Sequence, residues 1–82
     1  MMKTDKFAIA KIYVPTKRRA TLEPERVQAL AENILENGQK IPIRVRADGQ
    51  RYVLVEGLHR LEACKALGEE TIVGYLVQAP KH

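Results

Sequence analysis

Two short segments on either side of Asp48-Gly49 constrain most strongly how this chain can fold. Residues 43–46 alternate apolar and basic side chains before that pair, and residues 52–55 return after it as an apolar run. Aspartate followed by glycine between two such segments is typical of a tight β-hairpin. Gly57 then breaks the second strand, and apolar residues with helical spacing follow. The segment predicts a β-hairpin that passes through a glycine turn into a helix.

The remaining segments predict one more helix and two more strands. Glu23 is a plausible N-cap and Pro24 suits a first helical position, so a helix is expected from there to Asn37. Its expected buried stripe has helical spacing. The expected elements are a strand over 7–14, a basic loop over 15–20, the helix with the stripe Val27, Leu30, Ala31, Ile34 and Leu35, the hairpin, a helix over 59–67 and a strand over 71–77.

Length and composition predict one small domain. The 82 residues suffice for a single core, expected over about residues 7–77 with tails at 1–5 and 78–82. The order β-α-β-β-α-β makes the fold class α/β, with α and β segments mixed in one unit (α+β). The sequence has no apolar run of membrane length and a single cysteine. We therefore expect a cytoplasmic protein without a membrane partner.

The formal net charge of +4 is concentrated in two stretches, at the start of the chain and around the hairpin. A clustered positive field favours anionic partners such as a nucleotide or nucleic acid. The aromatic residues do not interleave with the basic ones along the chain, as they do in stacking platforms for single strands. The candidate nucleic-acid-binding residues are Lys17, Arg18, Arg19, Lys40, Arg44 and Arg46.

The turn Gly57-Leu58-His59-Arg60 is the strongest candidate for a binding site. The first N–H groups of a helix have no intrahelical partner, and the helix dipole adds partial positive charge there. Glycine lets the backbone approach a ligand closely. Arginine offers a planar fork of donors that suits phosphate, and histidine can donate from one ring nitrogen. The turn predicts a phosphate site.

The run from Leu22 to Leu76 resembles the N-terminal domain of the ParB/sulfiredoxin superfamily. The resemblance rests on the Pro42-Ile43-Arg44-Val45-Arg46 strand, an apolar strand that ends at Glu56, and the Gly-x-His-Arg box before a helix. It implies a ParB/sulfiredoxin-like fold that holds a nucleotide phosphate chain at Gly57, Leu58, His59 and Arg60. CTP, or ATP and ADP, with Mg²⁺ are the implied cofactors.

The chain departs from the family pattern at several positions. Sulfiredoxins place their reactive cysteine where Leu58 stands, so the resemblance does not extend to sulfiredoxin activity. Cys64 lies on the apolar side of the second helix and is expected to be a buried structural thiol. Glu62 stands where ParB proteins have an arginine. The helix-turn-helix of ParB proteins has no counterpart among the 82 residues.

Several functions stay open at this point. The leading one is a regulatory nucleotide-binding module. The alternatives are DNA binding, a domain that binds a protein partner or a second copy of itself, and an enzyme of nucleotide hydrolysis or phosphotransfer with Glu56 and His59 as catalytic candidates. No structural metal is expected, because His59, His82 and Cys64 do not have the spacing of metal ligands.

Overall fold

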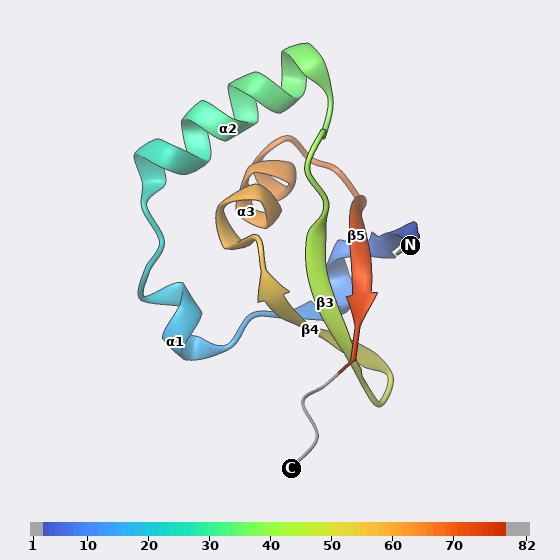
Figure 1. The fold of residues 1–82 in the computed structure, drawn as a ribbon. Helices are drawn as coiled ribbons and strands as arrows, with labels where there is room; N and C mark the ends of the chain where they lie inside the picture. The colour runs from blue at the N-terminus through green and yellow to red at the C-terminus, as the bar shows by residue number, and fades with distance from the viewer. Residues whose placement is uncertain (1–2, 79–82) are drawn as a thin grey trace.

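A computed structural model describes residues 3–78 of the chain (Figure 1). The elements are β1 (Thr4–Ala8), the 3-10 turn η1 (Ile9–Lys11), β2 (Ile12–Tyr13), α1 (Thr16–Arg19), α2 (Pro24–Asn37), β3 (Ile43–Asp48), β4 (Arg51–Glu56), α3 (Leu58–Ala66) and β5 (Thr71–Val77). The described residues form one mixed sheet with α3 packed on one side of it and α2 lying over α3.

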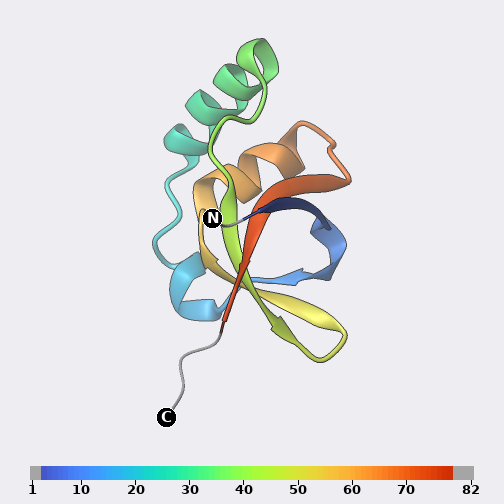
Figure 2. The same cartoon turned by 45° about the vertical axis from the view of Figure 1, so that its right-hand side comes forward.

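The sheet is curled because its two edge strands follow each other in the chain. Its order is β1-β5-β3-β4-β2, so β1 and β2 lie at opposite edges. Edge strands of a flat five-stranded sheet would lie about 19 Å apart. The chain from Ala8 to Ile12 can span at most about 14 Å. The sheet must therefore bend until its edges approach each other, and Figure 2 shows this curvature.

The register of the strands separates a core face from an outer face. Residues that pair across neighbouring strands point to the same face, and successive residues alternate. Ile12 pairs with Tyr52, Val45 with Leu54, and Phe7 with Ile72, and this face packs against α3. The core contains Phe7, Ile9, Ile12, Val14, Ile43, Val45, Leu54, Leu58, Leu61, Cys64 and Ile72.

Helix α2 lies over α3 and not over the sheet, so it is held by little apolar burial (Figure 1). Each of its 14 residues stays at least partly exposed. The predicted stripe is half-buried at four positions, but the fifth prediction was wrong, because Leu35 is 74% exposed. A helix with one neighbouring helix buries only a narrow stripe, and Leu35 lies outside it.

The side chain of Gln39 anchors the segment that follows α2. Its Nε2 donates to the carbonyl oxygens of Val73 at 2.7 Å and Ile41 at 3.1 Å. Its Oε1 accepts the N–H of Val73 at 2.9 Å. The Gln39 side chain thus bonds to Val73 of β5, one residue before Gly74, where the pairing of β3 with β5 begins. These bonds fix the end of α2 relative to the sheet.

The hairpin and both long helices were predicted correctly, and two other segments were not. The strand expected over 7–14 is interrupted by η1 and divided between the two edges of the sheet. The loop expected over 15–20 contains the short helix α1. β1 begins at Thr4, so regular structure extends into the segment 1–5 that was expected as a tail. Of the other expected tail, residues 79–82, including His82, lie outside the described residues.

Candidate functional site

Gly57 makes the turn from β4 into α3. Its backbone has φ 111° and ψ 32°, in the left-handed region that favours glycine. A β-carbon at this position would lie 2.6 Å from Cγ2 of Ile43. The close approach that requires glycine is therefore to the core strand β3, and the approach of this backbone to a ligand stays a prediction. The turn leaves the first N–H groups of α3, from Leu58 to Arg60, without intrahelical partners.

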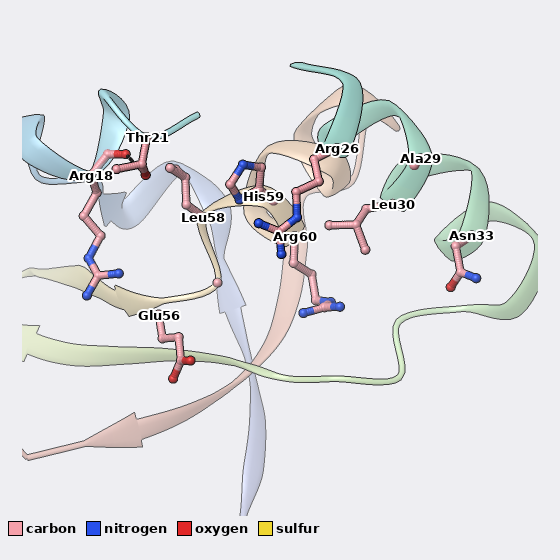
Figure 3. A pocket seen from close by; sticks show the side chains of 11 residues that line it. Arg18, Thr21, Arg26, Ala29, Leu30, Asn33, Glu56, Leu58, His59 and Arg60 are labelled. Carbon is pink, nitrogen blue, oxygen red and sulfur yellow. Dashed lines mark hydrogen bonds between the residues drawn. The ribbon is translucent and has the colours of Figure 1, made fainter. Parts of the chain in front are cut away.

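A cavity of about 600 Å³ opens in front of this helix N-terminus (Figure 3). Its walls come from the β4–α3 turn, from α1 and the segment after it, and from the side of α2 that faces them. Leu58 is only 6% exposed and belongs to the core, although it also borders the cavity. The lining residues are Arg18, Thr21, Arg26, Ala29, Leu30, Asn33, Glu56, Gly57, Leu58, His59 and Arg60.

Three arginine side chains from three helices line this cavity. Arg18 comes from α1, Arg26 from the first turn of α2 and Arg60 from the first turn of α3. Within residues 3–78, no carboxylate lies within 4.0 Å of Arg18 or Arg60. Arg26 lies 3.6 Å from the carboxylate of Glu23, in a pair whose two side chains are each 65% exposed. Exposed pairs of this kind compensate little charge, so the cavity carries a positive field.

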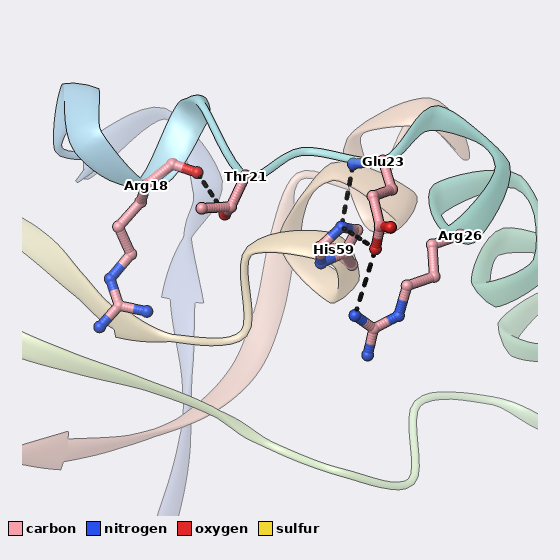
Figure 4. Close-up of polar contacts among 5 residues, drawn as sticks. All are labelled: Arg18, Thr21, Glu23, Arg26 and His59. Carbon is pink, nitrogen blue, oxygen red and sulfur yellow. Dashed lines mark hydrogen bonds and ion pairs between the residues drawn. The ribbon is translucent and has the colours of Figure 1, made fainter.

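His59 joins the N-terminal ends of α2 and α3 (Figure 4). Its Nε2 accepts a hydrogen bond from the backbone N–H of Glu23 at 3.0 Å. A ring nitrogen that accepts this bond carries no proton, so Nδ1 is the nitrogen that can donate. The Glu23 carboxylate lies 3.9 Å from the same Nε2. His59 therefore holds two walls of the cavity together and can offer a phosphate one N–H at most.

Glu56, the second catalytic candidate, lies at the mouth of the cavity. Its side chain is 69% exposed, and its carboxylate is 3.8 Å from the guanidinium of Arg44. The structure thus gives Glu56 and His59 different partners, and within residues 3–78 no hydrogen bond or ion pair joins one to the other. What it brings together at the cavity is one acid, one neutral imidazole and three guanidinium groups.

The six residues predicted for nucleic-acid binding fall in different parts of the fold. Arg18 lines the cavity, Arg19 points to smaller neighbouring cavities, and Lys17 is exposed on α1. Lys40 is exposed in the connection between α2 and β3. Arg44 and Arg46 alternate with buried residues of β3 and so point to the outer face of the sheet.

Most of the cavity wall that α2 provides was not predicted from the sequence. Arg26, Ala29, Leu30 and Asn33 follow the spacing i, i+3, i+4 and i+7, which places them on one face of a helix. That spacing is visible in the sequence. Nothing in the sequence says that this face looks toward the N-terminus of α3, because that depends on how the two helices pack.

Cys64 is buried, as predicted. Burial raises the pKa of its thiol from the ordinary value, the carboxylate of Glu69 raises it further, and Arg60 opposes the two effects. Such a thiol forms little thiolate near neutral pH and is a poor nucleophile. Among the described residues, no group of three histidine, cysteine or acidic side chains could hold a metal ion. No helix within residues 3–78 is both long and apolar enough to cross a membrane.

The fold and the cavity define a small α/β domain with a cationic cavity at a helix N-terminus. A family model described as the ParB N-terminal domain matches residues 3–82. The chain therefore belongs to the ParB N-terminal domain family, which confirms the resemblance seen in the sequence. A comparison with curated proteins gives no match.

Several solved structures have this fold. Sulfiredoxin from Arabidopsis thaliana is 27% identical with a TM-score of 0.83, over 94% of this chain and 86% of that one. ParB from Caulobacter crescentus, complexed with CTP-gamma-S, is 24% identical with a TM-score of 0.83, over 96% of this chain but 46% of that one. The same ParB has been solved on its centromeric parS site. A free serine kinase in complex with AMP is 16% identical with a TM-score of 0.79, over 93% of this chain and 31% of that one.

Proposed function

We propose that the cavity between α2 and the N-terminus of α3 binds the phosphate chain of a nucleotide. The observation that carries the proposal is that Arg18, Arg26 and Arg60 line one cavity at the N-terminus of α3, where the first N–H groups have no intrahelical partners. An anion in the cavity would compensate the positive charge that these side chains bring to it. A helix N-terminus is itself a site for phosphate, since its N–H groups and its dipole both favour negative charge.

The relatives support a nucleotide as the source of the phosphate. The Caulobacter ParB holds CTP-gamma-S, and the free serine kinase has been solved with AMP and with ADP. A cavity of about 600 Å³ lies within the range of small-molecule sites. Ala29, Leu30 and Asn33 continue the face of α2 that carries Arg26 and add an apolar wall with one amide. CTP, ATP and ADP are accordingly the candidate ligands, with Mg²⁺ beside Glu56 as a candidate companion.

Binding without turnover is the role that the site favours. His59 uses one ring nitrogen to hold α2, and the exposed Glu56 faces Arg44. Charge-assisted hydrogen bonds contribute about 1.5–3 kcal/mol each. Loss of orientational freedom costs at least about 4 kcal/mol. Three such contacts then leave at most about 5 kcal/mol, so the expected dissociation constant is about 0.2 mM or weaker.

Amide spectra of ¹⁵N-labelled protein, recorded during titration with CTP and then ATP, each with Mg²⁺, test the proposal. We expect saturable shifts centred on residues 57–61. Arg60→Ala should raise the dissociation constant about 10- to 150-fold, because it removes one charge-assisted contact. Arg46→Ala is the matched control, since it removes an arginine from the outer face of the sheet and should change the constant less than about threefold.

Two results would contradict the proposal. One is a spectrum that does not change at millimolar nucleotide. The other is equal affinity of the parent protein and the Arg60→Ala variant. The unphosphorylated nucleosides serve as a further control, since cytidine or adenosine that bound as well as the nucleotides would show that phosphate is not recognised.

A further inference from the structure

The outer face of the sheet carries basic and aromatic side chains that the nucleotide cavity does not use. The described helices α2 and α3 pack on the other side of the sheet (Figures 1 and 2). Tyr13 pairs with Val53, and Val53 pairs with Arg46, so these three residues form one row across β2, β4 and β3. Their neighbours Ile12, Leu54 and Val45 point into the core. Tyr13 and Arg46 therefore stand on the same outer face, two strands apart.

Tyr13 and Arg51 form a stacked pair on this face. The guanidinium carbon of Arg51 lies 4.3 Å from the centroid of the Tyr13 ring. The carboxylate of Asp48 holds the same guanidinium at 3.0 Å, across the hairpin turn. Tyr13 is nevertheless 39% exposed, which is high for a large side chain paired in a sheet. The pair is thus a fixed, flat and solvent-accessible π surface with a positive charge.

Two more cations border the pair. A cavity of about 270 Å³ beside Tyr13 is lined by Lys11 from η1, Arg19 from α1 and Arg51 from β4. Within the described part of the chain, no carboxylate lies within 4.0 Å of Lys11, Arg19 or Arg46. Lys11, Arg19 and Arg51 border the exposed ring, and Arg46 stands two strands away on the same face. These cations, with Asp48 paired to one of them, provide charge complementarity for an extended anion.

We infer that this outer basic surface, formed by Lys11, Tyr13, Arg19, Arg46 and Arg51, binds single-stranded nucleic acid. Lysine and arginine side chains bind the phosphates, and the Tyr13–Arg51 pair offers a face on which a base can stack. The bases of a duplex are stacked on each other and cannot reach such a face. An acidic peptide would match the charge but would gain nothing from the exposed ring. The surface is separate from the nucleotide cavity, so the inference does not depend on the proposed function.

This surface could not be predicted from the sequence, because its residues are far apart in the chain. Along the sequence the aromatic and basic residues do not interleave, which argued against a stacking platform. The pairing of β2 with β4 brings Lys11 and Tyr13 beside the hairpin residue Arg51. Arg19 of α1 lines the same cavity. Of the six cations predicted for nucleic acid, Arg19 and Arg46 belong to this surface.

Fluorescence anisotropy of a labelled oligothymidylate of about ten nucleotides, a length that single-strand grooves cover, tests the inference on the whole chain. We expect saturable binding whose affinity falls as salt rises, by about 0.7 log units per phosphate contact for each tenfold change in salt. Tyr13→Leu should weaken binding about 5- to 150-fold, since it removes the stacking ring and keeps an apolar side chain. Arg46→Gln should weaken it and reduce the salt slope by about 0.7.

Lys40→Gln is the matched control, because it removes a charge from an exposed position away from this surface and should change the affinity less than about twofold. An equal loss in Lys40→Gln and Arg46→Gln would overturn the inference, as would unchanged binding in Tyr13→Leu. Absence of binding at about 50 mM salt, or stronger binding of a duplex than of its single strand, would also overturn it. Displacement of the oligonucleotide by polyglutamate at equal charge would overturn it as well, because it would show that the surface binds acidic peptides. If Tyr13→Leu does not fold, Arg46→Gln decides alone.

Discussion

Alanine in place of Gly57 tests whether the turn into α3 is fixed by its contact with β3. The new residue would have to keep φ 111°, where an L-residue costs about 1–2 kcal/mol. Its β-carbon would also lie 2.6 Å from Cγ2 and 2.9 Å from Cβ of Ile43. Ile43 is 1% exposed and cannot move away without disturbing the core, so overpacking adds about 1–3 kcal/mol. The expected loss in the free energy of unfolding is about 2–5 kcal/mol.

Urea denaturation measures this loss directly. A domain of this size has a total stability of about 4–12 kcal/mol, and its unfolding free energy changes by about 1 kcal/mol per molar urea. The midpoint of Gly57→Ala should therefore fall by about 2–5 M. Gly49→Ala in the hairpin turn is the control: Gly49 has φ 61°, but a β-carbon there meets no atom within 4 Å. It should lose only the backbone contribution, about 1–2 kcal/mol.

Equal losses in Gly57→Ala and Gly49→Ala would refute the reasoning, because they would show that the contact with Ile43 contributes nothing. A double-mutant cycle with Ile43→Ala gives an independent check. Removing Cγ2 of Ile43 should make the second change, Gly57→Ala, less costly by about 1 kcal/mol or more. A cycle with additive effects would point to backbone conformation alone.

Two further predictions concern the core and the end of α2. Gln39→Ala should lose about 1–3 kcal/mol in the free energy of unfolding and speed hydrogen exchange at the Val73 amide, because the partly buried N–H and carbonyl of Val73 lose their hydrogen bonds. The control is Gln28→Ala, at an exposed position of α2, which should lose almost nothing. Equal losses in the two variants would contradict the anchoring role of Gln39. Burial raises the pKa of Cys64 above the 9.0 of an ordinary thiol, so the stability linked to its neutral form is present below about pH 9 and lost as pH rises through the folded-state pKa. The difference in unfolding free energy between the parent protein and Cys64→Ala should therefore shrink above about pH 9, and a difference that does not change with pH would contradict it.

The elements with strong local signals could be predicted from the sequence. Asp48-Gly49 fixes the hairpin and Pro24 starts α2, so these segments needed no tertiary information. The strand expected over 7–14 could not be divided correctly, because its alternation gives no sign that the sheet curls. The break at η1 follows from closing the distance between two sheet edges, which is a property of the whole fold. The exposure of Leu35 likewise depends on α2 having a single neighbouring helix.

The candidate site also has a part that could be predicted from local sequence and a part that depends on tertiary packing. All four residues of the Gly57–Arg60 turn border the cavity, because a strand, a glycine and a helix N-terminus form one local unit. Arg26 and Asn33 lie in the opposite wall, and their role depends on the packing of α2 over α3. The partner of His59 could not be foreseen either, since Glu23 is 36 residues away in the chain.

The cavity and the outer basic surface share two structural elements, β4 and α1. β4 carries Arg51 at its start and leads to Gly57 at its end, but Leu54 between them is 2% exposed in the core, so the strand is held in one position. α1 is different, because none of its four residues is buried. Arg18 on this helix lines the cavity, while Arg19, the next residue, lines the outer basic surface. A phosphate that draws Arg18 inward would shift Arg19 as well. If binding at one site affects the other, α1 is therefore the element through which that coupling should pass.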